Sequence, residues 1–196
     1  MSELPAVCVF CGSSPGADPA FAAAAAELGA SLARSGTRLV YGGGSVGLMG
    51  VVADAALDAG GDVLGVITEA LLAKEIAHKG LSELIVVPTM HERKAAMAAA
   101  ASAFVMLPGG FGTFDEFFEA VTWTQLGVHT KPSGILDVDG YFTPLRAMFD
   151  SAVTQRFVRA EHRDQILIDD DVEQLLARLR SWTPVATPKW LDRTQV

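Results

Sequence analysis

The 196-residue sequence has few cysteines, few basic residues and no apolar run long enough to cross a membrane. Its 15 Lys and Arg residues are outnumbered by 23 Asp and Glu residues, which gives a net charge of −8. This balance argues against nucleic acid as a partner, because binding to its phosphates needs a basic patch. It does not exclude a small anionic ligand, which backbone N–H groups and one or two cations can hold.

The absence of targeting features and the scarcity of cysteine narrow the class of protein further. The longest nearly apolar run, from Ala95 to Leu107, is too short for a bilayer, and residues 1–5 lack the pattern of a signal peptide. We therefore expect a cytoplasmic protein with no membrane partner. Cys8 and Cys11 have C-x-x-C spacing, but no second pair completes a zinc site. Because both lie in or at the end of an apolar run, we expect two buried or partly buried thiols.

Short apolar runs alternate with helical patterns along the chain. This alternation predicts an α/β fold, a Rossmann-like parallel sheet with helices on both faces. We expect a single domain over residues 1–182 and an extended tail over residues 183–196. The expected strands are AVCVFCG, TRLVYG, DVLGVI, ELIVVP, AFVMLP, PSGILD and QILID, and the expected helices cover about 18–35, 47–59, 90–102, 113–127, 142–156 and 171–182.

The loops that follow the strands are where such a sheet binds ligands, at a switch point in strand order. Four of these loops are unusual: CGSSPG, YGGGSVGLMG, PTMHERK and PGGFGTFDE. Glycine leaves the backbone accessible, and the N–H groups at the start of a helix carry a partial positive charge. The two glycine-rich turns at helix starts therefore favour an anion-binding site.

The stretch PGGFGTFDE also has a purely structural interpretation. Thr113 and Glu116 have the spacing of a capping box, which predicts a helix that starts at Thr113. In that interpretation Glu116 bonds a backbone N–H and has no catalytic role.

A second capping box, formed by Thr89 and Glu92, predicts a helix that starts near residue 90. Arg93 and Lys94 then lie in its first turn, where positive charge opposes the helix dipole. Either an anionic ligand compensates these two cations, or they form a solvated pair whose aliphatic stems pack against the protein.

These motifs together resemble one known family. PGGFGTFDE fits the signature P-G-G-x-G-T-x-x-E, and it occurs with CGSS, YGGGSVGLMG, MHERK and TWTQLGVHTKPSGILDVDGYF. The chain is thus similar, over about residues 6–150, to the LONELY GUY family of cytokinin riboside 5′-monophosphate phosphoribohydrolases, often labelled lysine decarboxylase-like. Phe111 stands where plant members commonly have Tyr, and Phe114-Asp115 where they have Leu-Glu. The resemblance implies a homodimer whose active site lies at the subunit interface.

The resemblance also implies a reaction and its residues. The implied reaction, a step of cytokinin biosynthesis, hydrolyses the bond between base and ribose in an adenosine 5′-monophosphate. Arg93 and Glu116 are the implied catalytic pair. The implied contacts with the nucleoside monophosphate are Ser14, Gly43, Gly44, Gly47, Glu75, Met90, Lys94, Gly109, Gly110, Phe111, Gly112 and Thr113. The histidines show no metal-ligand spacing, and we expect neither a metal nor a cofactor.

Two other functions are compatible with parts of the pattern. A nucleotide-binding sensor or carrier without turnover explains the glycine-rich loops but leaves the combination of Arg93 and Glu116 unexplained. A decarboxylase that uses pyridoxal phosphate needs a Schiff-base lysine and an acid for the pyridinium nitrogen. No such context surrounds the candidates Lys74, Lys79, Lys94, Lys131 and Lys189.

Overall fold

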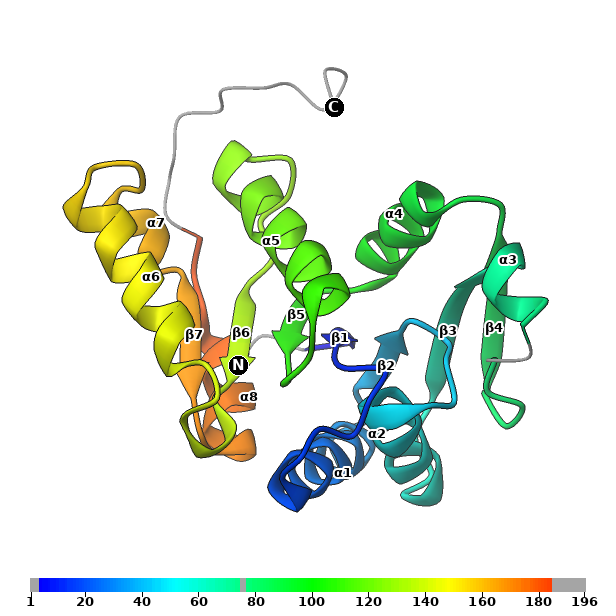
Figure 1. Cartoon of the computed structure of the whole chain (residues 1–196). Helices are drawn as coiled ribbons and strands as arrows, with labels where there is room; N and C mark the ends of the chain where they lie inside the picture. Colours follow the sequence, from blue (N-terminus) through cyan, green and yellow to red (C-terminus); the bar gives the residue numbers. More distant parts are fainter. Residues whose placement is uncertain (1–3, 75–76, 185–196) are drawn as a thin grey trace.

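The computed structural model describes residues 4–74 and 77–184. Within these residues, seven parallel strands form one sheet in the order β4-β3-β2-β1-β5-β6-β7 (Figure 1). The strands are β1 (Ala6–Phe10), β2 (Arg38–Tyr41), β3 (Val63–Thr68), β4 (Glu83–Val87), β5 (Ala103–Met106), β6 (Ser133–Leu136) and β7 (Ile166–Asp169). The predicted parallel α/β sheet is confirmed, and each predicted strand is present.

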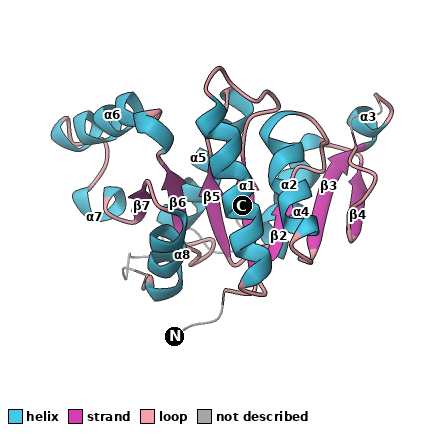
Figure 2. Ribbon diagram, turned by 90° about the horizontal axis from the view of Figure 1, so that it is seen from below, coloured by secondary structure: helices cyan, strands magenta, loops and turns pink. Residues whose placement is uncertain are grey.

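Helices cover both faces of the sheet (Figure 2). One face packs against α1 (Pro19–Arg34), α2 (Gly47–Asp58) and α8 (Val172–Ser181), and the other against α4 (Met90–Ala100), α5 (Phe111–Leu126) and α6 (Thr143–Thr154). The short helices α3 (Glu69–Leu72) and α7 (Ala160–Arg163) and the 3-10 turn η1 (Val138–Gly140) lie in the connections. The sequence did not predict α7 or η1, which are each only three or four residues long.

The side chains of β1 alternate between the two cores, because successive side chains of a strand point to opposite faces. Val7 and Val9 pack in the core beneath α1, α2 and α8, whereas Cys8 and Phe10 pack in the core beneath α4 and α5. Cys11 belongs to the first of these cores, so the two cysteines are buried, free and on opposite faces. The prediction of two buried or partly buried thiols is confirmed.

The strand order of the sheet reverses at β1, which is hydrogen-bonded to β2 on one side and to β5 on the other. The chain builds outward from β1 to β4 and then returns to place β5 next to β1. The loops that leave β1 and β5 therefore diverge and open a crevice at the carboxyl ends of these strands. The sequence CGSSPG lies in the first of these loops, and PGGFGTFDE begins in the second and continues into the first turns of α5.

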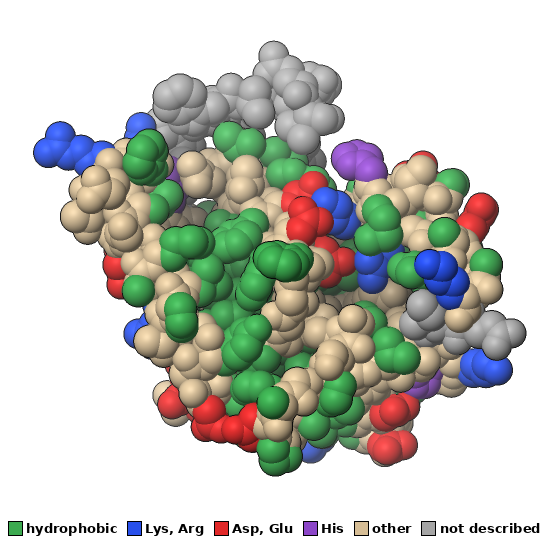
Figure 3. Space-filling view, viewed as in Figure 1, with side chains coloured by type: hydrophobic (Ala, Val, Ile, Leu, Met, Phe, Trp, Pro, Cys, Tyr) green, Lys and Arg blue, Asp and Glu red, His purple; other side chains and the backbone are tan. Residues whose placement is uncertain are grey.

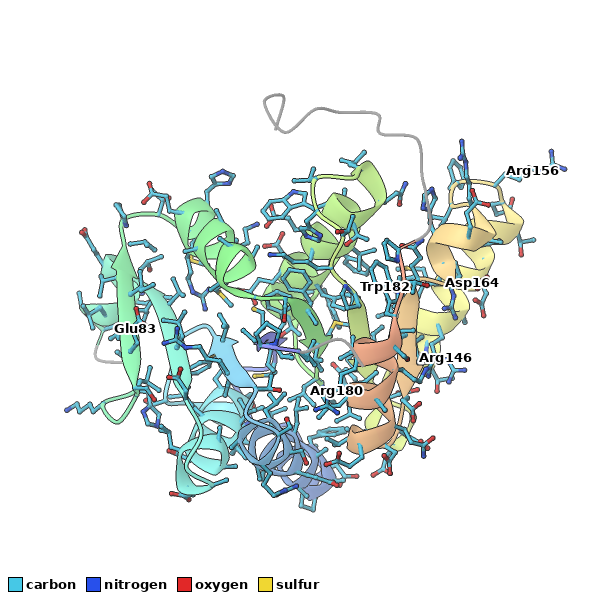
Figure 4. All side chains as sticks on the ribbon, turned by 180° about the vertical axis from the view of Figure 1, so that it is seen from behind. Glu83, Arg146, Arg156, Asp164, Arg180 and Trp182 are labelled. Atoms are coloured by element: carbon cyan, nitrogen blue, oxygen red, sulfur yellow. The ribbon has the colours of Figure 1, made fainter. Side chains whose placement is uncertain are left out.

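Charged side chains occupy the outer regions of the fold. Glu83 lies on the edge strand β4 and pairs with Arg38, while Arg146 and Arg156 lie at the opposite side of the molecule (Figure 4). Charges on an edge strand disfavour pairing with another sheet. Across residues 4–74 and 77–184, no helix has both the length and the apolar character needed to span a bilayer.

Candidate active site

The turn from β5 into α5 differs from the sequence prediction. The helix begins at Phe111 with Gly110 as its N-cap, two residues before the predicted start at Thr113. The first turn closes when the Phe114 N–H donates to the Gly110 carbonyl at 3.1 Å. The predicted capping box is therefore wrong: Thr113 is already inside the helix, and no side chain caps the N-terminus. Glu116 consequently has no role in starting the helix.

The glycines of this turn leave the backbone at the start of α5 open. A Cβ atom on Gly110 or Gly112 would have no neighbour within 4 Å. A Cβ atom on Gly109, in contrast, would collide with Thr113 Oγ1 and approach the backbone nitrogen of Gly12 to 2.8 Å. Gly109 thus allows the loops after β1 and β5 to touch, and Gly110 and Gly112 leave room for a ligand beside the N–H groups.

Arg93 and Glu116 come together although they are 23 residues apart. Arg93 Nη1 donates to Glu116 Oε1 at 3.0 Å, and the two side chains are only 8% and 13% exposed. The guanidinium is fixed by two further bonds, from Nε to the Val66 carbonyl at 2.9 Å and from Nη2 to the Gly42 carbonyl at 3.1 Å. Three bonds to three different segments hold Arg93 rigidly, and Arg93 in turn fixes one oxygen of Glu116.

The start of α4 agrees with its predicted capping box. Thr89 is the N-cap, and its hydroxyl accepts from the Glu92 N–H at 3.2 Å. Arg93 is buried and paired, so it is not part of a solvated surface pair. The carboxylate of Glu116 compensates its charge, which removes the argument that this cation requires an anionic ligand.

Lys94 also has partners within the protein. Its Nζ lies 3.3 Å from Asp115 Oδ2 and 3.1 Å from Glu119 Oε2, both on α5. Figure 3 shows acidic and basic side chains meeting where α4 faces α5. The first turn of α4 is therefore joined to α5 by two groups of charges, with Arg93 buried and Lys94 nearer the surface.

Burial raises the pKa of the Glu116 carboxyl, and the Arg93 guanidinium opposes this rise. Glu116 also affects the end of β1: burial first, and then the Glu116 charge, raise the pKa of the Cys11 thiol. The carboxylate therefore acts close to the switch point of the sheet. Among the described residues, Arg93 is its hydrogen-bond partner and contacts Oε1, which leaves Oε2 for a water or a substrate.

The loop after β2 helps to position the Arg93–Glu116 pair, because its Gly42 carbonyl accepts a hydrogen bond from Arg93. A Cβ atom on Gly42 would collide with Arg93 Nη2, so only glycine lets the guanidinium reach the Gly42 carbonyl. Gly47, with φ of +59°, starts α2 so close to the loop after β1 that a Cβ atom would collide with the backbone of Ser13 and Ser14. These glycines bring the loops after β1 and β2 together at the crevice and let Arg93 of α4 reach the loop after β2.

An open cavity of about 240 Å³ lies in the crevice between the loops after β1 and β5. Residues 12–16 and 108–110 form two of its sides, and Phe21, Leu48 and Tyr141 complete the lining. This volume lies just below the usual range of small-molecule sites, about 300–1,000 Å³. The lining combines backbone of glycine-rich loops with aromatic rings, which suits a ligand with an anionic group.

The structure brings some of the predicted contact residues together and leaves others apart. Ser14, Gly109 and Gly110 line the cavity, and Thr113 is buried beneath Gly109. Phe111 and Met90 are exposed large hydrophobic residues. Two of the other predicted positions pack against neighbouring strands or loops: a Cβ atom on Gly43 would contact Ile67 and Leu84, and Gly44 forms a β-bridge with Ala77. Glu75 lies outside the described residues.

Tyr141 is a cavity residue that the sequence analysis did not single out. It follows the 3-10 turn after β6, and its hydroxyl donates to the Gly109 carbonyl at 2.6 Å. The sequence could have indicated this residue, because Tyr141 lies in the loop after β6 and so at the same carboxyl edge of the sheet as the loops after β1 and β5. Among the residues that the structure describes, no group of three or more His, Cys, Asp or Glu side chains is arranged to hold a metal.

Comparison with known proteins identifies the family. A family model described as "Possible lysine decarboxylase" matches residues 49–179. A probable cytokinin riboside 5′-monophosphate phosphoribohydrolase of Oryza sativa subsp. japonica is 48% identical over 177 residues, which cover 90% of this chain and 79% of the relative. A cytokinin riboside 5′-monophosphate phosphoribohydrolase of Arabidopsis thaliana is 46% identical over 93% of this chain and 86% of its own length.

The fold is also found in solved structures. A molybdenum cofactor binding protein from Rippkaea orientalis superposes with a TM-score of 0.70 over 91% of this chain and 97% of its own. Its 21% sequence identity supports a common fold and nothing more. The sequence relatives carry the assignment: this chain belongs to the family of the cytokinin riboside 5′-monophosphate phosphoribohydrolases.

Proposed function

We propose that this protein hydrolyses the N-glycosidic bond of adenosine 5′-monophosphates, cytokinin riboside 5′-monophosphate or AMP, to free base and ribose 5-phosphate. The observation that carries the proposal is that α5 joins two features: its glycine-rich start borders the cavity at the switch point of the sheet, and its Glu116 forms the buried pair with Arg93. Family membership supports it, since the curated relatives are named for this reaction on cytokinin nucleotides.

Glu116 is the proposed catalytic carboxylate. As the bond between C1′ and the base nitrogen breaks, its electron pair stays with the base and positive charge develops on the sugar. A carboxylate next to C1′ stabilises this charge and accepts a proton from the water whose oxygen bonds to C1′. The departing base takes up one proton from solvent, so that water supplies OH to C1′ and H to the base. Glu116 Oε2, which has no hydrogen-bond partner in the described part of the chain, is available for this role, while Arg93 holds Oε1 and so fixes the direction of the carboxylate.

The start of α5 is the proposed site of the 5′-phosphate. No side chain caps its N–H groups, and the spaces beside Gly110 and Gly112 are open. Phosphate accepts hydrogen bonds from such N–H groups and is favoured by the helix dipole. Binding energy from the phosphate would then position C1′ at Glu116, one and a half turns further along the same helix.

The alternative functions fit the site less well. A carrier without turnover gives no reason for a buried carboxylate whose position is fixed by a triply bonded arginine. For a decarboxylase that uses pyridoxal phosphate, the candidate is Lys94, which lines a small pocket together with Glu116 and is not part of the cavity lining. Burial pulls the pKa of Lys94 down, but its bonds to Glu119 and Asp115 outweigh this and raise it. A protonated lysine held by two carboxylates is a poor Schiff-base nucleophile.

We also propose that the protein acts as a homodimer, with its active site at the subunit interface. Hydrophobic side chains gather over α5 and between α5 and α6 (Figure 3), where Phe118 packs edge-on against Phe149. Within the described residues, α6 buries none of its side chains fully, and Met148 on it is 54% exposed. Phe111, at the start of α5 beside the proposed phosphate site, is 93% exposed. A second copy that covers α5 and α6 would shield Met148 and Phe111 from solvent.

The need for the 5′-phosphate tests the proposed reaction. We expect kcat/KM for AMP, or for an N6-prenylated AMP, to exceed that of the matching nucleoside by at least about a hundredfold, because remote binding energy is lost with the phosphate. Comparable values for nucleotide and nucleoside would contradict the proposed phosphate site. Light scattering at micromolar concentration tests the assembly, and a monomeric mass would contradict the dimer.

A further inference from the structure

The Gly109–Gly110 peptide is hydrogen-bonded by a side chain from another part of the fold. Tyr141 Oη donates to the Gly109 carbonyl at 2.6 Å across 32 residues of sequence. Both glycines lack the Cβ atom that would restrict rotation of the peptide between them. Because a trans peptide is planar, its carbonyl oxygen and its N–H point in opposite directions. The bond from Tyr141 therefore fixes the direction of the Gly110 N–H as well as that of the Gly109 carbonyl.

Tyr141 is itself held firmly. Its ring packs edge-on against Phe21 with centroids 5.5 Å apart and against Phe142 with centroids 4.9 Å apart. The turn that carries it has positive φ at Asp139 (49°) and Gly140 (72°). Positive φ is uncommon for a residue such as Asp139 and persists where surrounding contacts hold it.

Asp137, just after β6, supplies those contacts. Its buried carboxylate accepts from the Phe142 N–H at 2.8 Å, and Arg146 on α6 lies 3.5 Å from its second oxygen. Figure 4 labels Arg146, on the side of the molecule opposite to Glu83. The end of β6 thus forms a rigid turn that presents one phenol to one carbonyl of the glycine-rich loop.

We propose that Tyr141 is a positioning residue for the 5′-phosphate, which it serves by fixing the orientation of the Gly109–Gly110 peptide. With the hydroxyl in place, the Gly109 carbonyl is occupied and cannot turn its partial negative charge toward the ligand. Without it, rotation about two glycines exposes a carbonyl oxygen in the cavity for part of the time, and the phosphate is repelled. The inference rests on the proposed function, since it assigns the residue that prepares its phosphate site.

The chain offers a matched control, because Tyr41 and Tyr141 are its two tyrosines. Tyr41 is fully buried in β2, and its hydroxyl has no hydrogen-bond partner among the described residues. Tyr141→Phe and Tyr41→Phe remove the same atom, from a bonded and from an unbonded position respectively. Loss of one hydrogen bond predicts that Tyr141→Phe weakens ribose 5-phosphate binding and raises KM for AMP by about tenfold each. Tyr41→Phe is expected to change neither.

The measurements are calorimetric titration with ribose 5-phosphate and steady-state kinetics with AMP, on the full chain. Phe21→Leu, which keeps the hydroxyl but removes a ring that holds it, provides a second variant and is expected to weaken ribose 5-phosphate binding two- to threefold. An unchanged dissociation constant in Tyr141→Phe, or equal weakening by Tyr41→Phe, overturns the assignment. If Tyr141→Phe does not fold, wild-type affinity in Phe21→Leu overturns it. Failure of the wild-type protein to bind ribose 5-phosphate or cleave AMP would instead refute the proposed function, and the assignment with it.

Discussion

Replacing Glu116 by glutamine separates a catalytic role from a structural one. The structure shows that Glu116 is not a helix cap, so the start of α5 at Gly110 does not depend on it. The glutamine oxygen can still accept the hydrogen bond from Arg93 Nη1, and Arg93 keeps its bonds to the carbonyls of Val66 and Gly42. The substitution therefore removes one charge and no packing volume.

We expect Glu116→Gln to lower the stability only slightly and the turnover severely. Arg93 loses a charged partner, which costs stability, but the protein no longer buries a carboxylate, which offsets part of that cost. We expect the free energy of unfolding to fall by about 1 to 2 kcal/mol, which lowers the melting temperature by a few degrees. A neutral amide cannot act as a base or stabilise the developing cation, so we expect kcat to fall by roughly a hundredfold or more.

The pH dependence provides an independent signature of the same residue. Because burial raises the pKa of Glu116 above 4.5, activity should fall as the pH drops through this raised pKa and the carboxylate becomes protonated. The folded protein holds this proton more tightly than the unfolded chain does. The free energy of unfolding should therefore decline as the pH rises from 4.5 through the raised pKa. Glu116→Gln should lack both effects.

The assay is single-turnover and steady-state cleavage of AMP or N6-prenylated AMP, run beside thermal unfolding of the same preparations. Lys94→Gln is a useful comparison, because it also removes a charge between α4 and α5 but leaves the Arg93–Glu116 pair intact. A folded Glu116→Gln protein with wild-type turnover would refute the catalytic role of Glu116. A loss of turnover that tracks the loss of folded protein would refute it equally.

Two further substitutions test the support of the catalytic carboxylate. Arg93→Lys keeps the charge but cannot make three bonds in three directions, so kcat is expected to fall at least about tenfold, and unchanged kcat would contradict a positioning role. Gly42→Ala places a methyl group where Arg93 Nη2 lies and is expected to lower both kcat and the melting temperature, whereas a structure of this variant with Arg93 in place would show that the loop adapts.

The general fold could be predicted from the sequence because each strand is a short apolar run, and these runs alternate with longer stretches that have a helical pattern. The alternation of Val7, Cys8, Val9 and Phe10 between two cores follows from strand geometry alone. The start of α5 was mispredicted because Thr113 and Glu116 have capping spacing, while the open glycines before them allowed the helix to begin at Phe111. Local sequence patterns do not show which of two competing starts the loop geometry allows.

The contacts between distant segments could not be predicted from spacing. Arg93 lies at the start of α4. The family resemblance paired it with Glu116, but no local pattern predicts that it also bonds to the carbonyls of Val66 and Gly42. The bond from Tyr141 to Gly109 depends on β5 and β6 being neighbours in the sheet. Such contacts follow from strand order, which a single sequence does not fix. The sequence pointed to four loops at the carboxyl ends of strands, but the bonds between these loops could not be predicted from it.

The central claim is that this protein releases a free base from a nucleoside 5′-monophosphate by using Glu116. The most direct measurement is to incubate AMP and N6-prenylated AMP, side by side, with the wild-type protein and with Glu116→Gln, and to quantify the products. The account predicts equal amounts of free base and ribose 5-phosphate from at least one nucleotide with the wild-type protein, and almost none with the folded variant. Binding of both nucleotides without release of base by the wild-type protein would contradict it.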